Sequence, residues 1–427
     1  MDAAKPLRRV KVEALQPGDI VLTATSGKIS RLVRRASKGM VSHAMICVQH
    51  GSTIDSTDDG VQASNIQREL YDADDYVAVL RLRDPLSDIG LHRLIDFARS
   101  EVGTSYSKVE AARTVMGGPK PRTRKMFCSR LVARAYAAAG IPLVMDPDYC
   151  TPEELRTSSL LCEVADILQD VSEAELAAWD ARPNPVAEMQ RLHNEILDFA
   201  RSIDPSIENF NDLDTFVQQH PEHDEKIARV YRESGYLALW KADFAINPWH
   251  YDIVEMDAIT NDRTVAGLRE YAIGTISEFH TGGLRFAVNL AHYEHSQLAG
   301  GRQTRFQLVQ LYRRLVHNDR TRRDTALTWL RRRFPDDAKR YLERIVPHSE
   351  LWFSIVDRVE PRLGMIARMN IEAKGDASGC SACGDPANDY LLVNSADAMP
   401  GVPSLRLCSD CVVIRRSGGE ILTPIDD

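Results

Sequence analysis

The N-terminal part of the chain alternates between strand-like and helix-like patterns. Short β-rich runs predict strands at 41–48, 52–56 and 76–82. The first two runs are joined by Gln49-His50-Gly51, which predicts a hairpin. Apolar residues at i, i+3 and i+4 spacing predict helices over 91–102 and 128–139. This alternation predicts an α+β domain over residues 1–165.

From residue 166 the pattern becomes mainly helical. Pro185 precedes apolar residues at helical spacing as far as Ala200, which predicts a helix that begins with Pro in its first turn. The same spacing predicts helices over 308–315 and 338–345, the second closed by Pro347. Residues 371–379 are small, polar and contain Gly, which is typical of a linker. We therefore expect a helical domain over 166–370 and a cysteine-rich module over 371–427.

The composition is that of an ordinary globular protein. Of the 427 residues, 44% are hydrophobic and 27% are charged, and no run of 18 uncharged apolar residues predicts a transmembrane segment. The first residues, Met1 to Arg9, contain no apolar segment of a secretory signal, so we expect a cytoplasmic chain unless export uses a route without a signal.

The formal net charge of −8 is unevenly distributed along the chain. Residues 1–165 contain 23 Lys and Arg against 20 Asp and Glu, whereas the rest contains 30 against 41. Two basic clusters, Lys28–Lys38 and Lys120–Lys125, lie in the N-terminal part. We expect them to favour an anionic or lipid-like substrate or surface there. Neither half is basic enough to predict nucleic-acid binding.

Cys128 has the position that a thiol nucleophile requires. It lies where a loop enters an amphipathic helix, and a helix N-terminus favours a thiolate and an oxyanion. His43 and Asp55 fall on the two strands of the predicted hairpin, with Asp55 opposite Met45 and on the face of His43. The three residues predict a Cys–His–acid set. A buried structural cysteine is the alternative interpretation.

Several short motifs occur in a characteristic order: Leu15-Gln-Pro-Gly-Asp-Ile-Val, Ser42-His43, Thr53-Ile-Asp55-Ser with Gly60-Val61, Gly103-Thr-Ser-Tyr106-Ser, Phe127-Cys128-Ser129 and Cys150-Thr-Pro-Glu-Glu-Leu155. Over about residues 12–160 this series resembles the permuted NlpC/P60 papain-like family, in its YiiX/YaeF-like branch, which is related to lecithin:retinol acyltransferases. The resemblance implies a circularly permuted papain-like fold in which the histidine precedes the cysteine.

The resemblance also implies roles for individual residues. Cys128 would be the nucleophile, His43 the base and Asp55 the residue that orients it. Ser42, Tyr106 and Arg130 would bind substrate. The family often has Glu at position 55 and an acidic residue at position 130, so Asp55 is a conservative departure and Arg130 a larger one.

The C-terminal cysteines form two CxxC pairs, Cys380 with Cys383 and Cys408 with Cys411. Four thiolates from two tight turns can surround one tetrahedral Zn²⁺ with no open position, which predicts one structural zinc ion per chain and none for catalysis. Two disulfides are the alternative. The pattern is similar to the treble-clef zinc-binding domain of ClpX-type unfoldases, which implies a role in binding a protein partner or in self-association.

These features predict a cysteine hydrolase that cleaves an amide or ester through a thioacyl-enzyme. An acyltransferase acting on a lipid or amine acceptor and a non-catalytic protein-binding module are the alternatives. Peptide, isopeptide, N-acyl amino acid and lipid ester all present a carbonyl to the same thiolate, so the residues leave the substrate open.

Overall fold

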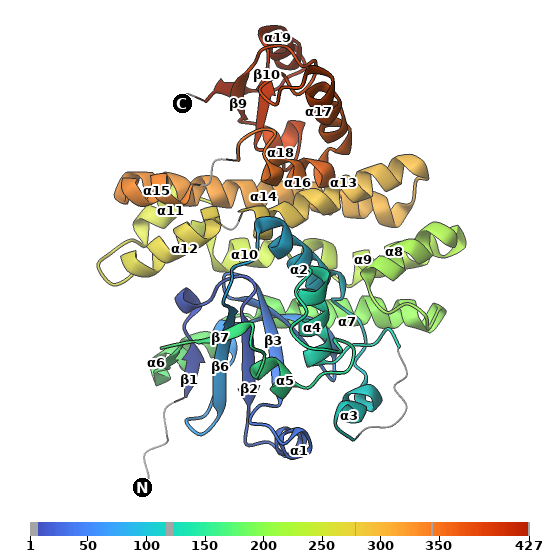
Figure 1. Cartoon of the computed structure of the whole chain (residues 1–427), viewed down its shortest axis with the longest axis vertical. Helices are drawn as coiled ribbons and strands as arrows, with labels where there is room; N and C mark the ends of the chain where they lie inside the picture. Colours follow the sequence, from blue (N-terminus) through green and yellow to red (C-terminus); the bar gives the residue numbers. More distant parts are fainter. Residues whose placement is uncertain (1–6, 117–122, 278, 343–344, 426–427) are drawn as a thin grey trace. The chain divides into compact units, whose positions relative to one another are not determined.

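The computed structural model describes residues 7–116, 123–277, 279–342 and 345–425 (Figure 1). They form two compact units, of which the first ends at Ala242 and the second begins at Asp243. The predicted basic cluster at 120–125 falls partly outside the described residues. Among the helices in these ranges, none combines the length and the apolar character needed to cross a bilayer.

The centre of the first unit is a six-stranded antiparallel sheet with the strand order β5-β4-β3-β2-β6-β7. Its strands are β2 (Ile20–Ala24), β3 (His43–Gln49), β4 (Ser52–Thr57), β5 (Gly60–Asn65), β6 (Tyr76–Leu82) and β7 (Leu161–Val164). A separate two-stranded sheet pairs β1 (Arg8–Val10) with β8 (Leu168–Asp170). The three strands expected from the β-rich runs are therefore β3, β4 and β6.

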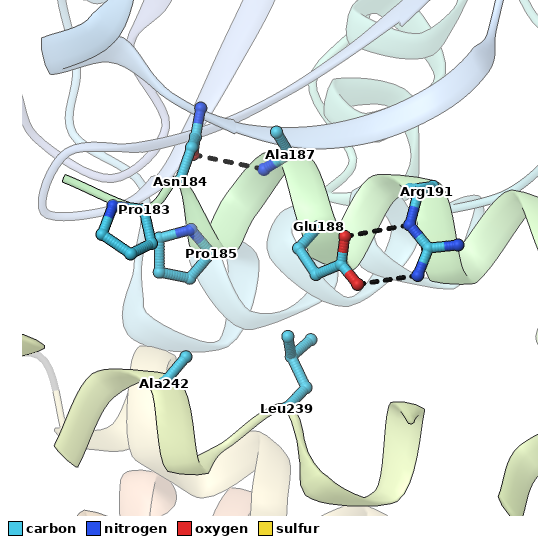
Figure 2. A pocket seen from close by; sticks show the side chains of 8 residues that line it. All are labelled: Pro183, Asn184, Pro185, Ala187, Glu188, Arg191, Leu239 and Ala242. Carbon is cyan, nitrogen blue, oxygen red and sulfur yellow. Dashed lines mark hydrogen bonds and ion pairs between the residues drawn. The ribbon is translucent and has the colours of Figure 1, made fainter. Parts of the chain in front are cut away.

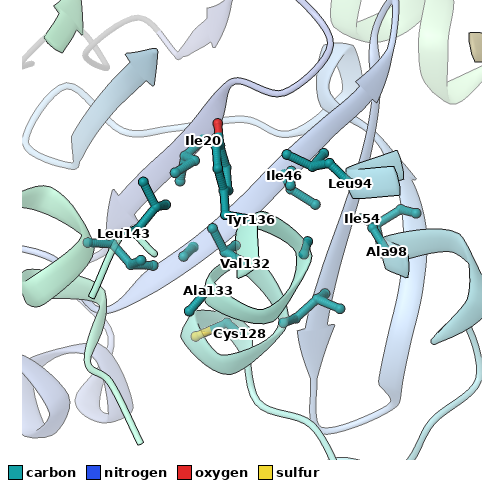
Figure 3. Close-up of a cluster of buried hydrophobic side chains, with 14 of the residues drawn as sticks. Ile20, Ile46, Ile54, Leu94, Ala98, Cys128, Val132, Ala133, Tyr136 and Leu143 are labelled. Carbon is teal, nitrogen blue, oxygen red and sulfur yellow. The ribbon is translucent and has the colours of Figure 1, made fainter. Parts of the chain in front are cut away.

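The described helices of the first unit are α1 (Lys28–Ser37), α2 (Asp88–Ser100), α3 (Lys108–Met116), α4 (Cys128–Ala138), α5 (Pro152–Arg156), α6 (Glu173–Asp180), α7 (Pro185–Ile203), α8 (Phe210–Gln219) and α9 (Asp224–Glu233). Of these, α2, α4 and α5 contribute buried side chains to the main core on the sheet. Figure 3 shows Val132 and Tyr136 of α4 packed with Ile20 and Ile46 of the sheet. These side chains are at most 1% exposed, and burying apolar surface is the main force that holds α4 in place.

The turn from Leu15 to Asp19, directly before β2, bonds to both a strand and a helix. Asp19 is 1% exposed and accepts hydrogen bonds from Arg81 of β6 at 2.8 and 2.7 Å, one to each carboxylate oxygen. The Tyr136 hydroxyl of α4 donates to the Gly18 carbonyl. A charged pair and a phenol thus connect the turn to a strand and to the helix that begins at Cys128.

The unit boundary differs from the predicted boundary at residue 165. α7 bonds to the sheet edge, with Gln190 Nε2 donating to the Ala63 carbonyl at 2.8 Å and Gln62 Nε2 to Asn194 Oδ1 at 2.8 Å. Arg201 of α7 also donates to the Gly103 carbonyl at 2.6 Å. Since these bonds join α7 to β5 and its neighbouring loop, residues 166–242 belong to the first unit.

The second unit is mainly helical. Its helices include α11 (Ile253–Ala258), α12 (Val265–Ser277), α13 (Leu284–Ala299), α14 (Gln303–Arg333), α15 (Pro335–Tyr341), α16 (Glu350–Val359), α17 (Pro361–Lys374), α18 (Ser395–Ala398) and α19 (Ser409–Ser417), and α10 (Lys241–Ile246) spans the boundary. The helix predicted over 338–345 ends at Tyr341, because Leu342 adopts an extended conformation.

A three-stranded antiparallel sheet, in the order β10-β9-β11, completes the second unit. Its strands are β9 (Asn388–Leu392), β10 (Ser404–Leu407) and β11 (Leu422–Pro424). The predicted linker over 371–379 begins within α17, which ends at Lys374 and is capped by Gly375 in the left-handed conformation. Cys380 and Cys408 share one core with Trp352 and Leu363 of the preceding helices, so the predicted module over 371–427 packs on them.

Candidate active site and four-cysteine cluster

Cys128 is the first residue of α4 and is 7% exposed. The segment before it is held by a parallel bridge, in which Ser107 N donates to the Met126 carbonyl and Met126 N to the Ser105 carbonyl, both at 2.9 Å. Ser129 Oγ donates to the Cys150 carbonyl at 2.7 Å. The first amide N–H groups of a helix have no intrahelical acceptor, so they are available to an anion beside the Cys128 sulfur.

His43 and Asp55 are joined across the β3–β4 hairpin. Asp55 Oδ2 lies 2.8 Å from His43 Nε2. Ile46 pairs with Ile54, and continuing this register sets Asp55 opposite Met45, as the residue pattern predicts. Because Asp55 occupies Nε2, the nitrogen Nδ1 is the one left to face another partner.

Electrostatics link His43 to Cys128. Burial alone would lower the pKa of His43, but the thiolate charge of Cys128 and hydrogen bonds to Asp55 and Cys128 raise that pKa well above its ordinary 6.5. The cysteine, the histidine and the acid therefore form one connected group, with the imidazole between sulfur and carboxylate. An ion pair of thiolate and imidazolium is the reactive form of such a group.

Tyr106 and Ser42 flank this group. The bridge between Tyr106 and Met126 holds the phenol near Cys128, and burial, with the charges of Cys128 and Asp58, raises the pKa of Tyr106 above its ordinary 10. The phenol is therefore a neutral hydrogen-bond donor at neutral pH. Ser42 Oγ lies 2.7 Å from Ser30 Oγ of α1 and 3.3 Å from the Thr23 carbonyl. Its hydroxyl therefore bonds to α1 and to the backbone of the neighbouring strand.

Arg130 lies inside the unit. Its side chain is 1% exposed and pairs with the buried Glu110 of α3. Its Nε donates to the Asp148 carbonyl at 2.8 Å and its Nη1 to the Lys125 carbonyl at 2.7 Å. These contacts connect α4 to α3 and to the loop before α5, and we leave Arg130 out of the proposed substrate site.

Two residues near the acid carry no signal in the sequence. The charges of Asp55 and His43 both act on Glu69, and burial with the Asp55 charge raises the pKa of the Glu69 carboxyl above 4.5. Tyr71 is 4% exposed, and its hydroxyl has no hydrogen-bond partner within the described residues. Burial and the charges of Glu69 and Asp55 raise its pKa above 10. Only the folded chain brings them beside Asp55.

Backbone constraints hold the loops around the site. Gly60, the first residue of β5, has a φ of +88°, and a Cβ there would lie 2.7 Å from the Thr104 carbonyl oxygen. Glu153 of α5 accepts from Met40 N at 2.7 Å and so fixes the turn before His43. A side chain at position 60 would meet the Thr104 carbonyl in a strained backbone conformation, so this position requires Gly.

In the first unit a histidine on a strand therefore precedes, in the sequence, a cysteine at a helix N-terminus. Residues 14–149 match the model of a family described as permuted papain-like amidase enzyme, YaeF/YiiX, C92 family. The matched span is about a third of the chain and contains His43, Asp55 and Cys128, and it is similar to the papain-like amidase family that the sequence motifs led us to expect. The comparison with curated proteins gives no match.

The second group of interest is the cluster of Cys380, Cys383, Cys408 and Cys411, whose sulfur atoms all lie within 4.8 Å of one another. Two of the separations are 3.6 Å, from Cys383 to Cys408, and 3.8 Å, from Cys411 to Cys383. Ligands at about 2.3 Å around a tetrahedral zinc ion are about 3.8 Å apart, so these four residues fit a metal ion. All eight cysteines are free, which excludes the alternative of two disulfides in this structure.

The backbone around the first CxxC pair forms a tight turn. Gly384 N donates to the Cys380 carbonyl at 2.9 Å, and Gly384 has a φ of +79°. Burial raises the pKa of the Cys380 thiol, but amide donors from Cys408, Ala382 and Cys383 outweigh it and lower that pKa to about 7. The second pair begins α19, directly after β10, so each pair is supported by a turn or a helix N-terminus.

A cavity of about 510 Å³ lies beside the start of α7, away from these groups. Figure 2 shows Glu188 and Arg191 paired on one side and Leu239 and Ala242 on the other. Asn184 caps α7 by accepting from Ala187 N at 3.2 Å. None of the lining residues belongs to the predicted site, Glu188 and Arg191 pair with each other, and Asn184 caps the helix, so we assign the cavity no role.

Proposed function

We propose that the first unit is a cysteine hydrolase that cleaves an amide or ester through a thioacyl-enzyme, with Cys128 as nucleophile, His43 as acid and base, and Asp55 as the residue that orients the imidazole. The observation that carries the proposal is the 2.8 Å contact between Asp55 and His43 in a chain segment that matches a permuted papain-like amidase family. We assign the domain to the NlpC/P60 group on the motifs that surround these residues.

The chemistry follows from the arrangement. The Cys128 thiolate attacks the carbonyl carbon, and the oxyanion that forms is stabilised by amide N–H groups at the start of α4. The imidazolium of His43 gives its proton to the leaving amine or alcohol as the bond to the carbonyl carbon breaks. A water molecule then loses a proton to His43 and attacks the thioester, which releases the acid and restores the thiol group.

Asp55 and Tyr106 have supporting roles in this proposal. Asp55 keeps a proton on Nε2, so that Nδ1 faces the sulfur and the imidazolium is stabilised during the reaction. Tyr106 is a neutral donor beside Cys128, suited to hydrogen-bond a substrate oxygen. Ser42 connects the strand that carries His43 to α1, which fixes the position of the base.

For the second unit we propose one structural Zn²⁺ held by Cys380, Cys383, Cys408 and Cys411, in a module of the treble-clef type. The tight turn at Gly384 and the helix that starts after Cys408 support this assignment. Four thiolates leave no open position on the ion, so it would stabilise the fold and take no part in the reaction. Val413 and Ile414 on α19 are each 67% exposed and would be available to a protein partner or a second copy.

A thiol-labelling experiment tests the catalytic assignment. We expect limiting iodoacetamide at pH 7 to modify Cys128 before Cys162, which is half-buried and donates to the Arg81 carbonyl. p-Nitrophenyl acetate should acetylate Cys128 with release of one equivalent of nitrophenol. Peptide mass mapping locates both modifications.

Variants of Cys128 and His43, with a matched control, test whether these residues carry out the reaction. Cys128→Ala should abolish acetylation, and His43→Gln should slow it about 100-fold, since general acid–base catalysis contributes that much or more. Cys162→Ala is the control and should behave as wild type. Acetylation that persists in Cys128→Ala and is unchanged in His43→Gln would reject the hydrolase proposal and favour a binding module. Transfer of the acyl group to added amines in preference to water would indicate the acyltransferase instead.

A further inference from the structure

The helix α1 combines a strongly basic face with an apolar one. Lys28, Arg31, Arg34 and Arg35 lie within it, Lys38 follows it, and no Asp or Glu occurs between residues 20 and 54. The apolar positions 29, 32, 33 and 36 recur at the spacing of one helix face. A helix that only packs on the domain would bury this face completely.

Leu32 does not follow that expectation, because it is 67% exposed. It lies four residues after Lys28 and three before Arg35, so both cations project on its side of the helix. Both of these cations are exposed. An exposed leucine between two cations is unfavourable in water but suits a surface that is apolar inside and anionic outside.

The neighbouring segments extend this surface. α1 packs against α3, on which Val109 is 61% exposed, and Met40, two residues after Lys38, is 53% exposed. Figure 1 shows α1 and α3 at the same end of the first unit. We call the set of exposed basic and apolar side chains the α1–α3 patch: Lys28, Arg31, Leu32, Arg35, Met40 and Val109.

The carboxylates close to this patch are already engaged. Glu153 accepts from Met40 N and pairs with Arg156, and Asp58 pairs with Lys108 of α3 at 2.8 Å. Asp75 accepts from Ser26 N at 3.2 Å, just before α1 begins. Among the ion pairs of the described residues, none involves a cation of α1, and an anionic partner would balance their charge.

We propose that the α1–α3 patch docks the protein on an anionic lipid membrane. The cations would contact lipid headgroups, and Leu32, Met40 and Val109 would enter the boundary between headgroups and acyl chains. Ser30 of α1 contacts Ser42, which directly precedes His43, so docking would hold the proposed active-site edge near the lipid surface. The binding itself goes beyond the proposed function and does not depend on it.

Vesicle sedimentation with the full chain tests the proposal. We expect binding to phosphatidylcholine vesicles that contain about one-third phosphatidylglycerol, and little binding to phosphatidylcholine alone. Because headgroup contacts are screened by salt, binding should weaken strongly between about 0.1 M and 0.5 M NaCl. Equal binding to both vesicle types would overturn the proposal.

Variants separate the patch from the rest of the surface. Each cation at an anionic surface is worth roughly fivefold in affinity, so Arg31→Glu with Arg35→Glu should weaken binding at least about 25-fold, and Leu32→Glu should also weaken it. Leu298→Glu and Arg263→Glu are the controls, since Leu298 is 89% exposed on α13 and Arg263 is exposed before α12. Unchanged circular dichroism and Cys128 labelling show that each variant is folded.

Membrane docking can be tested independently of whether the first unit is an enzyme. Membrane binding by a protein that Cys128→Ala has made inactive would support docking, whether or not catalysis is found. If polyglutamate binds as tightly as the vesicles and Leu32→Glu has no effect, the patch recognises an acidic protein and the membrane proposal is rejected. Loss of binding in both control variants would reject it as well.

Discussion

Asp55 Oδ2 contacts His43 Nε2 at 2.8 Å, although the two residues are twelve positions apart on neighbouring strands. The side chains are 10% and 26% exposed, so the carboxylate is largely shielded from solvent while the imidazole keeps a face open. This contact leaves the second imidazole nitrogen for Cys128.

Replacing Asp55 should affect the reaction more than the fold. In Asp55→Asn the amide oxygen can still accept from Nε2–H, so orientation is retained while the charge is lost, and we expect about a 10-fold fall in the acetylation rate of Cys128. Asp55→Ala loses both the orientation and the charge, and should lower the acetylation rate about 100-fold or more. Stopped-flow detection of nitrophenol measures both rates. Equal rates in wild type and Asp55→Ala would show that the acid has no role in orienting His43.

The pKa of His43 should depend on Cys128. Burial lowers this pKa, whereas Cys128 and Asp55 raise it well above 6.5, so removing the thiolate in Cys128→Ala should lower it. NMR titration of the labelled imidazole measures the shift. His220, whose side chain is 45% exposed, provides an internal reference signal for comparing the two proteins. An unchanged His43 pKa in Cys128→Ala would contradict the contact between sulfur and imidazole.

The same raised pKa predicts a pH-dependent stability. A group whose pKa is higher in the folded protein stabilises the fold when protonated, so the contribution of His43 is complete below about pH 6.5 and is lost as the pH rises through its folded value. The free energy of unfolding of wild type relative to His43→Gln should therefore be larger at acid than at alkaline pH. Urea titration followed by the exposure of Cys150, which is 1% exposed, reports on the first unit. The opposite pH trend would contradict the direction of the shift.

Glu110 and Arg130 should stabilise the first unit only as a pair. Their side chains are 2% and 1% exposed, so Glu110→Gln leaves an uncompensated buried charge and should reduce the free energy of unfolding by about 3–5 kcal/mol. The double variant Glu110→Met with Arg130→Met should lie much closer to wild type, because neither charge remains. A double-mutant cycle with the Cys150 probe measures the coupling. Additive losses in the double variant would show that the two residues act independently.

Metal removal should loosen the C-terminal module and leave the thiol site intact. The native chain should contain one zinc ion by elemental analysis. Chelation should increase hydrogen exchange over 380–417, because metal binding provides much of the folding free energy of such a module. Labelling of Cys128 should be unchanged. If chelation abolished Cys128 labelling while the C-terminal region stayed protected, the metal would belong to the catalytic centre.

Local patterns predict the elements that carry the site. The helix that starts at Cys128, the hairpin that sets Asp55 opposite Met45, and the two CxxC pairs depend on residues close together in sequence. Strand register and helix termini are determined by side-chain periodicity and turn residues, which are visible in the sequence itself. The sequence by itself therefore determined the proposed nucleophile, base and metal ligands as candidates.

The tertiary structure decided what depends on distant contacts. The family resemblance implies that Arg130 binds substrate. In the structure it pairs instead with Glu110, twenty positions away, in the interior of the unit. Glu69 and Tyr71 lie near Asp55, and α7 joins the first unit through bonds to β5. None of these contacts leaves a periodic or local signature, because pairings between distant segments arise only when the hydrophobic core brings those segments together.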